Sequence, residues 1–449
     1  MSDSLPSLEE QIDSPPRTRR TAPWRHIVTV RFLHTSDWQL GMTRHYLEGE
    51  AQPRFTADRA DTVRRLLELA RERDCAFVVV AGDVFDHANL SPRDLGRALE
   101  AMGSAAVPVH LLPGNHDPLG AGSLWDTPAV ADRLPPNASV LRDSAPVAVA
   151  DGVEIVGAPW RTRKPDGDPV APALEGLPAD GTVRIVVGHG MLEELDPDAD
   201  SPVTVRRAPL DQALQDGRIH YVALGDRHIR WPQDGSGAIQ YSGAHETTSF
   251  HERGRGQVLE VEIDPSAPAD DQVRVRAHEV GRWEHIVIRQ QLDGPEDIRA
   301  LAARLDALDP KERTLVKTAL TGALTVGQAA ELDQVLDSRR SLFASLEAWE
   351  RRTELVILPD DDELAELSLG GFAQEALEQL RGLSQRGAPA AVSGGAAGGE
   401  EASPGESAES LAEQAEQDEL LAEPAPPPLH ETAQDALRLL VRLSGGQRA

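Results

Sequence analysis

The sequence predicts an α/β protein with one large layered domain and a smaller second one. From about residue 26 to residue 265, short β-branched runs alternate with segments of helical periodicity, which is typical of layered α/β folds. After Pro265 a shorter β/α pattern begins, and it ends near Pro359. With 449 residues, 40% of them hydrophobic, the chain is long enough for two or three domains with their own cores.

The large domain, residues 26–265, begins with two helix–strand units. In DTVRRLLELARERD, Val63, Leu66, Leu67 and Ala70 share one helical face, and the following run CAFVVVAGD predicts a buried strand. SPRDLGRALEAM and VPVHLLPGNHD predict the next helix and strand. Later runs of strand length are VEIVGAP, RIVVGHG, HYVALGDRH, AIQYSG and GQVLEVEI. Since few helical segments separate them, we expect more sheet than a doubly wound fold contains.

The smaller domain, residues 266–359, also mixes strands and helices. QVRVRAHEV and EHIVIRQQL predict two strands, and DIRALAARLDAL predicts a helix with one apolar face. The domain is completed by RTLVKTALTG, by a long helical segment from about Val326 to Glu350, and by TELVILP.

The two ends of the chain differ in composition from these domains. Residues 1–25 predict a disordered leader, residues 360–385 a short acidic helix, and residues 386–428 a disordered linker rich in Gly, Ala, Pro and Glu. Residues 429–449 predict a terminal amphipathic helix, which either packs back on the body or docks a partner. Its apolar stripe consists of Ala433, Ala436, Leu437, Leu440 and Val441.

The charge and the cysteine content limit the possible partners and the cellular compartment. The formal net charge is −29, from 45 Lys and Arg against 74 Asp and Glu, which by itself disfavours nucleic acid as a partner. Much of the negative charge lies in the tail, so its placement matters more than its sum. The single cysteine, Cys75, excludes an internal disulfide framework and predicts a buried thiol in a reducing compartment. Neither a signal peptide nor a membrane span is evident, so we expect a cytoplasmic protein.

Five loops that follow apolar runs carry polar side chains. They are Asp37-Trp38-Gln39, Gly82-Asp83-Val84-Phe85-Asp86, Gly114-Asn115-His116-Asp117, Gly188-His189 and Gly225-Asp226-Arg227-His228. A rigid sheet can aim such side chains at one point, and together they offer the carboxylates, amide oxygen and imidazoles that two divalent cations need. Asp83 is the natural bridging carboxylate. We expect His116 to stabilise phosphate charge or to protonate the leaving oxygen, with Asp117 orienting it.

These motifs carry a resemblance to a known family. LHTSDWQLG, VVVAGDVFD, LLPGNHD, VVGHG and YVALGDRH resemble, in order and context, the calcineurin-like metallophosphoesterases. Within that superfamily the chain is similar to the SbcD-type DNA repair nucleases, bacterial relatives of the eukaryotic double-strand-break repair nuclease. The resemblance covers about residues 31–263, and the segment up to about Pro359 is similar to the family's capping domain. It implies a four-layer α-β-β-α sandwich with a smaller α/β capping and DNA-binding domain.

The resemblance also implies a site and an activity. Asp37, Asp83 and His228 would bind one metal, Asp83, Asn115 and His189 the other, and His116 would be the catalytic histidine. The expected cofactors are two manganese ions, with magnesium as the alternative. The implied reaction is hydrolysis of DNA phosphodiesters, as exonuclease and endonuclease, in double-strand-break repair. The implied partners are DNA, an SbcC-like coiled-coil ATPase and a second copy of the chain.

Two positions depart from the family pattern. Gln39 stands where the pattern Asp-x-His has a histidine, and Asp226 stands where Gly-His-x-His has its first histidine. Both side chains can coordinate through oxygen, and an added carboxylate favours hard ions such as manganese or magnesium over zinc. Alternatively, Gln39 hydrogen-bonds a metal-bound water and leaves that metal more exchangeable. The opposite interpretation is a degenerate site in a protein that persists as a structural subunit.

Several arginines are candidate contacts for the substrate. Arg44, Arg161 and Arg163 are candidate phosphate contacts, as are Arg274 and Arg276. No aromatic stacking platform is evident, so we expect contacts to the backbone and shape of DNA more than to its bases. Two other functions remain open: a stand-alone metallophosphoesterase acting on nucleotides or other small phosphate esters, and a non-catalytic subunit that binds DNA or the ATPase.

Overall fold

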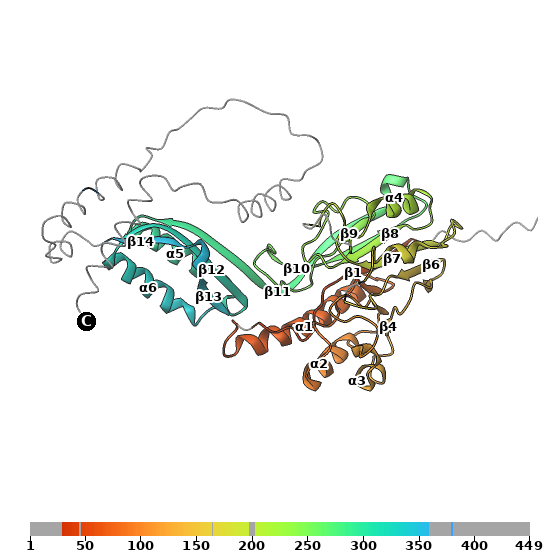
Figure 1. The fold of residues 1–449 in the computed structure, drawn as a ribbon, viewed down its shortest axis with the longest axis horizontal. Helices are drawn as coiled ribbons and strands as arrows, with labels where there is room; N and C mark the ends of the chain where they lie inside the picture. The colour runs from red at the N-terminus through yellow and green to blue at the C-terminus, as the bar shows by residue number, and fades with distance from the viewer. Residues whose placement is uncertain (1–28, 45, 164, 197–202, 359–378, 380–449) are drawn as a thin grey trace, which may run out of the picture. The chain divides into compact units, whose positions relative to one another are not determined.

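The protein is described from a computed structural model, which places residues 29–44, 46–163, 165–196, 203–358 and 379 (Figure 1). The predicted leader, acidic helix apart from residue 379, linker and terminal helix lie outside these described residues. The chain divides into two compact units. In their described parts, the first comprises residues 29–41, 60–245 and 257–280, and the second comprises residues 42–59, 246–256 and 281–358.

The first unit contains two β-sheets and the helices that cover them. One sheet has the strand order β11-β10-β1-β2-β3-β4, and the other has the order β5-β6-β7-β8-β9. The elements, in chain order, are β1 (Val30–Thr35), α1 (Ala51–Glu72), β2 (Val78–Val80), α2 (Pro92–Met102), β3 (Val109–Leu111), α3 (Pro128–Ala131), β4 (Ala138–Val140), β5 (Val147–Ala150), β6 (Val153–Gly157), β7 (Val183–His189), α4 (Arg207–Gln215), β8 (Tyr221–Gly225), β9 (Ile239–Tyr241), β10 (Arg255–Ile263) and β11 (Val273–Leu292). Helix α1 and strand β11 each run from one unit into the other.

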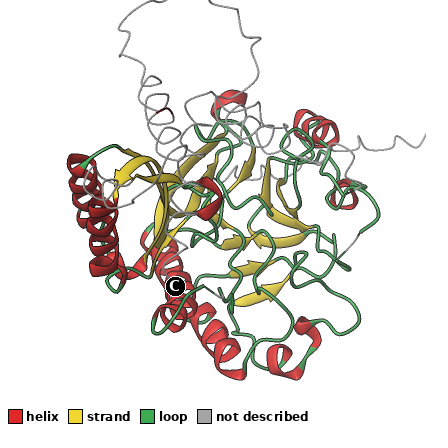
Figure 2. Cartoon of the chain, turned by 60° about the vertical axis from the view of Figure 1, so that its left-hand side comes forward, coloured by secondary structure: helices red, strands yellow, loops and turns green. Residues whose placement is uncertain are grey.

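Alternating side chains of the strands build three hydrophobic layers. Val79 of β2 and Ile185 of β7 belong to one cluster, which fills the space between the two sheets. Their neighbours point the other way, because side chains along a strand alternate between faces: Val78 packs in a cluster with α1 and α2, and Val186 packs in a cluster with α4. Figure 1 shows α2 and α4 on opposite sides of these strands, and Figure 2 shows the strands in yellow with red helices outside them. The predicted α-β-β-α sandwich is thus confirmed.

Parallel pairing brings the predicted loops to one edge of each sheet. Strand β1 pairs in parallel with β2, and β2 with β3, while β7 pairs in parallel with β8. Parallel strands end at the same edge, so the loops after β1, β2 and β3 emerge together, as do those after β7 and β8. This topology gathers polar side chains that lie far apart in the sequence.

His34, on β1, joins the two sheets close to these loops. Its Nε2 lies 3.1 Å from the carbonyl oxygen of Leu224, and its Nδ1 lies 3.0 Å from the hydroxyl of Tyr221, both on β8. Because a carbonyl only accepts, Nε2 carries the hydrogen and the Tyr221 hydroxyl donates to Nδ1. Burial lowers the pKa of His34 to about 3, so the ring stays neutral in the folded protein.

Replacing His34 by glutamine is expected to make the first unit less sensitive to acid. The folded pKa of about 3 lies below the ordinary value of 6.5, so the unfolded chain binds the proton first. The stability linked to His34 is therefore fully present above about pH 6.5 and is lost as the pH falls toward 3. Between about pH 7 and pH 4.5 the parent protein should lose roughly 3 kcal/mol more than His34→Gln. Urea unfolding of both proteins at the two pH values measures this difference, and equal losses would contradict it.

The second unit is a smaller parallel sheet with helices on one face. Strand order is β13-β12-β11, and β14 also pairs with β12. Helices α5 and α6 pack their apolar residues, including Leu301 and Leu332, against Ile288, Val316 and Leu320 of the sheet. The remaining elements are α5 (Pro295–Asp306), β12 (Thr314–Thr325), α6 (Val326–Arg340), β13 (Ser345–Ala348) and β14 (Glu354–Leu358). No helix among the described residues combines the length and the apolarity needed to cross a membrane.

Two predictions about elements of the second unit are wrong. The two strands expected around residue 281 form the single strand β11, because the Glu246 carboxylate accepts the backbone N–H groups of Arg282 and Trp283, at 2.9 and 3.0 Å, and keeps the chain extended there. The helix expected to reach Glu350 ends at Arg340, because residues 345–348 pair in parallel with β12 as β13. Tertiary pairing here overrides local helix propensity.

Candidate metal centre

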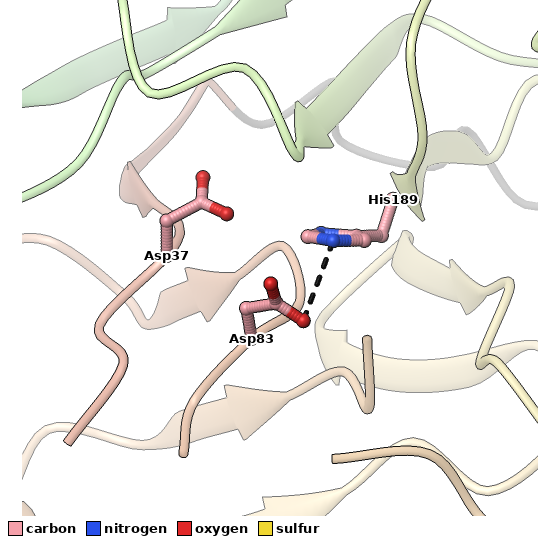
Figure 3. Close-up of side chains that lie close together, drawn as sticks. All are labelled: Asp37, Asp83 and His189. Carbon is pink, nitrogen blue, oxygen red and sulfur yellow. Dashed lines mark ion pairs between the residues drawn. The ribbon is translucent and has the colours of Figure 1, made fainter. Parts of the chain in front are cut away.

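The polar loops of the first unit converge on one buried centre. Asp37 follows β1, Asp83 follows β2 and His189 is the last residue of β7. Their ligand atoms all lie within 4.8 Å of one another, and all three side chains are buried. Figure 3 shows the two carboxylates and the imidazole facing the same space, with the ion pair between Asp83 Oδ1 and His189 Nε2, 3.4 Å apart, as a dashed line.

Backbone strain is concentrated at this centre. Asp37, Gln39, Asp83 and Asp226 have φ angles of 52°, 40°, 52° and 91°, and Asp74 is the one further non-glycine residue with positive φ in the described part of the chain. Such conformations cost energy for residues with a Cβ, and they are typical of sites where side chains must point in a required direction. Gly114 allows the loop after β3 to approach Asp83 closely, because a Cβ at this position would lie 2.2 Å from Asp83 Oδ1.

The hydrogen bonds of His189 leave one ring nitrogen facing the centre. Its Nδ1 lies 2.8 Å from the carbonyl oxygen of Ala81 and therefore carries a hydrogen. The lone pair of the neutral ring is then on Nε2, which lies 2.9 Å from Asn115 Oδ1. In its opposite orientation, the Asn115 amide would instead donate to Nε2 and to both Asp83 oxygens. In either orientation the Asn115 amide lies within hydrogen-bonding distance of His189, and a cation bound here would be reached by its oxygen.

The pKa shifts also indicate a centre short of positive charge. Burial raises the pKa of Asp37 and of Asp226 above the ordinary aspartate value. Burial lowers the pKa of His189, but the carboxylates of Asp83, Asp226 and Asp37 outweigh it and hold that pKa well above its usual value. Buried carboxylates gathered in this way favour positive charge at the centre, which a divalent cation would supply.

Gln39 and His228 lie beside Asp37. His228 Nε2 is 3.8 Å from Asp37 Oδ1 and 3.3 Å from Gln39 Nε2. Gln39 Oε1 is buried and has no hydrogen-bond partner among the described residues. Rotating the Gln39 amide would exchange its two ends and place oxygen beside the His228 nitrogen, so that both offer lone pairs to a cation.

Asp226 lies on the His189 side of the centre. Its Oδ1 is 3.7 Å from His189 Nε2, and its backbone N–H donates to both Asp37 oxygens, at 3.2 and 3.3 Å. Gln39 therefore lies next to His228, and Asp226 lies next to His189. The residues present fit a divalent cation, because Asp37, Asp83 and His189 are buried and their ligand atoms lie within 4.8 Å of one another.

His116 is held by a backbone carbonyl. Its Nδ1 lies 2.7 Å from the carbonyl oxygen of Asp86, so Nδ1 carries a hydrogen and Nε2 faces the centre, 3.9 Å from Asp83 Oδ2. The expectation that Asp117 orients His116 is wrong. The Asp117 carboxylate accepts the backbone N–H groups of Gly114 and Phe85, at 2.7 and 3.0 Å, and so ties two centre loops together.

The sequence marks Asp86 by its side chain, but the contact that Asp86 makes with His116 Nδ1 comes from the main chain. Every residue has a carbonyl, so no side-chain pattern marks the one that bonds His116. Burial, with the nearby Asp83 charge, raises the pKa of Asp117 to about 7.

The candidate phosphate contacts are arginines in varied settings. Arg44 belongs to the second unit, where its Nη2 donates to the Thr248 carbonyl at 2.8 Å. Arg161 and Arg163 are exposed on the first unit, and Arg161 donates to the Arg142 carbonyl at 2.9 Å. Arg274 forms an ion pair of 3.3 Å with Glu262, and Arg276 is exposed. A role in substrate binding stays a prediction for all of them.

Comparisons with known proteins agree with this fold and centre. Residues 30–252 match the family model "Calcineurin-like phosphoesterase". The chain is 27% identical over 249 residues to the DNA double-strand break repair protein Mre11 of Archaeoglobus fulgidus, covering 50% of this chain and 52% of that protein. It is 27% identical over 134 residues to a subunit of the nuclease SbcCD of Bacillus subtilis, covering 29% of this chain and 28% of that protein. The chain thus spans about half or less of these curated relatives.

Among solved structures, a match is the crystal structure of TT1561 of Thermus thermophilus. The TM-score is 0.34 at 11% sequence identity, covering 56% of this chain and 100% of that one. The family assignment does not depend on this likeness. It follows from the sequence match over residues 30–252, which contain the converging strands and all the ligand candidates. Residues 30–252 therefore form a calcineurin-like phosphoesterase domain.

Proposed function

We propose that the protein is a metal-dependent DNA phosphodiesterase that acts as exonuclease and endonuclease in double-strand-break repair. The observation that carries the proposal is the convergence of buried Asp37, Asp83 and His189, with lone pairs facing one another, next to His116 at the rim. DNA as the substrate is supported by the two relatives, which are named as a nuclease and as a DNA repair protein.

Seven residues would hold the two cations. Asp83 would bridge them, with one group of ligands on the Asp37 side and the other on the His189 side. The first group is Asp37, Gln39 and His228, and the second is Asn115, His189 and Asp226. Manganese is the proposed metal and magnesium the alternative, because five of these seven side chains offer oxygen. When bound, the cations would supply Lewis acidity toward the phosphodiester and a nucleophilic water at neutral pH.

His116 would act on the substrate from the rim of the centre. Its Nδ1–H bond to the Asp86 carbonyl fixes the ring, so that Nε2 is the atom that holds or gives up a proton. A protonated Nε2 would donate to the leaving oxygen, or it would stabilise the negative charge on phosphate. Its side chain is 42% exposed, which leaves it within reach of a bound ester.

The partners are part of the same proposal. We infer an SbcC-like ATPase as the partner, with residues 429–449 as the docking segment, a homodimer within the complex, and a cytoplasmic location. If the docking assignment holds, deleting residues 429–449 weakens ATPase binding and spares hydrolysis of a small diester. A folded truncation that lost diester hydrolysis would contradict it.

Metal-dependent hydrolysis by the full-length protein tests the activity. Metal-stripped protein would receive manganese, magnesium or zinc, with linear duplex DNA and bis-p-nitrophenyl phosphate as substrates. Manganese-dependent cleavage of both is the expected result. Cleavage of the small diester alone would favour a stand-alone phosphoesterase or an obligatory ATPase. No cleavage by folded protein that binds no metal would favour a non-catalytic subunit, which the substitutions Gln39 and Asp226 would then explain.

A further inference from the structure

One face of the second unit's sheet gathers cations around a tryptophan. Arg289 of β11, Lys317 of β12 and Arg352 of the short 3₁₀ helix Glu350–Arg352 place their charged groups 6.0, 5.7 and 5.8 Å from the centre of the Trp349 ring. Lys317 Nζ also lies 4.7 Å from the centre of the Phe250 ring. We call this set of five residues the Trp349 cluster.

Strand alternation places the cluster on the face opposite α5 and α6. Ile288 and Val316 pack against these helices, so their neighbours Arg289 and Lys317 point to the other side of the sheet. In the strand register Val287 pairs with Lys317, and Arg289 with Ala319, so the two cations lie on adjacent strands of that face. Arg289 is exposed, and Lys317, Trp349 and Arg352 are half-buried.

The loop that carries Trp349 is fixed to the sheet. The Trp349 backbone N–H donates to the Thr318 carbonyl at 2.8 Å, and the Thr353 hydroxyl donates to the carbonyls of Thr318 and Trp349, at 3.2 and 3.0 Å. The backbone that carries the ring is therefore fixed before a ligand packs on the ring, which lowers the entropic cost of binding.

The electrostatics of the cluster favour an anionic ligand. Three cations around one ring repel one another, while each is attracted to the ring face. Acidic residues are near as well: Glu347 pairs with Lys317 in the strand register, and Glu350 begins the 3₁₀ helix. Lys317 nevertheless forms no ion pair with a described carboxylate. In a chain of net charge −29, three cations around one aromatic ring are a specific feature and not a consequence of composition.

We propose that the Trp349 cluster binds single-stranded DNA, with one unpaired base stacked on Trp349 and the cations on the flanking phosphates. Stacking on an aromatic ring requires a base outside a duplex, and combining such rings with cations is the usual way of holding single strands. The inference rests on the proposed function for its choice of DNA, and it supplies the stacking platform that the sequence did not reveal.

The test measures binding by full-length protein in EDTA, so that cleavage plays no part. Fluorescence anisotropy would follow a labelled oligothymidine and a duplex of the same length. Trp349→Ala should weaken single-strand binding about tenfold, with a smaller effect on the duplex, and Trp349→Phe should restore most of the affinity. Lys317→Glu should weaken both and reduce the salt dependence. Arg340→Glu, on the exposed side of α6, is the charge control and should change neither.

Three outcomes decide the inference. Unchanged single-strand binding by folded Trp349→Ala overturns it, as does an equal loss on single strand and duplex. Trp349-dependent single-strand binding supports the inference. If the parent protein binds single strands in this way but hydrolyses no phosphodiester, the proposed function fails and this inference stands. Hydrolysis of bis-p-nitrophenyl phosphate should be equal in the parent, Trp349→Ala and Lys317→Glu, because none of these changes lies in the metal centre.

Discussion

Replacing Asp83 by alanine is expected to lower hydrolysis of DNA and of bis-p-nitrophenyl phosphate by about 10³-fold or more. Asp83 is the proposed bridging carboxylate, and it lies 3.4 Å from His189 Nε2 and 3.9 Å from His116 Nε2. Its Oδ1 also accepts the backbone N–H of His116, at 3.0 Å. One substitution therefore removes the bridging ligand and an anchor of the catalytic histidine.

Manganese binding gives a second readout for Asp83. Calorimetric titration of metal-stripped protein should find two sites in the parent and weakened binding at both in Asp83→Ala. The fold should survive, because burial is the main cause of the raised pKa of Asp37 and Asp117, and removing the Asp83 charge relieves the further repulsion that adds to it. Asp126→Ala, which removes an exposed carboxylate paired with Arg142 at 2.7 Å, is the matched control and should leave both properties unchanged. Two intact manganese sites in Asp83→Ala would rule out the bridging role.

Replacing His116 by alanine is expected to slow DNA hydrolysis by about 10² to 10⁴-fold while metal binding is kept. If Nε2 protonates the leaving oxygen, the loss depends on the leaving group. The sugar alkoxide released from DNA is strongly basic and needs a proton, whereas p-nitrophenolate is weakly basic and leaves without one. The rate for bis-p-nitrophenyl phosphate should therefore fall much less than the rate for DNA.

The control for this experiment is His87→Ala. His87 and His116 each expose 42% of the side chain, but His87 neighbours the Asp86 carboxylate and does not approach Asp83. The control should retain the parent rates on both substrates. Equal losses on DNA and on the small diester in His116→Ala would show that His116 stabilises phosphate charge and does not act as the acid. Unchanged rates on both would exclude either role.

The composition of the centre bears on metal choice. Asp226 adds a carboxylate 3.7 Å from His189 Nε2, at a position where the resembling family has an imidazole. Carboxylate and amide oxygens prefer hard ions, whereas imidazoles also suit zinc. Manganese or magnesium would therefore be retained more readily than zinc, which the metal series proposed above measures directly.

Much of the candidate centre is predictable from the sequence, because its polar residues directly follow apolar runs and therefore stand at the ends of strands. Each loop begins where an apolar run stops, and parallel neighbours end at one sheet edge. The sequence places Asp37, Asp83 and His189 at such endings, and the structure brings their ligand atoms within 4.8 Å of one another. The strained φ angles of Asp37 and Asp83 explain why these short loops turn so sharply after their strands.

Hydrogen-bond partners in the loops could not be predicted in the same way. Asp117 is adjacent to His116 in sequence, yet it bonds backbone N–H groups of two loops, while the Asp86 carbonyl holds the imidazole. Which carbonyl or N–H lies within about 3 Å depends on the path of both loops, and that path is set by the packed sheets.

By itself, the sequence determined the layered α/β class, the strand endings and the ligand types, since these follow from hydrophobic periodicity and from side-chain chemistry. Only the tertiary structure decided where β11 continues, where α6 ends and which groups face Trp349. Arg289, Lys317 and Trp349 lie on separate segments, and their convergence depends on strand register and on which sheet face the helices cover. Local sequence specifies neither, because both are fixed by contacts between residues distant in the chain.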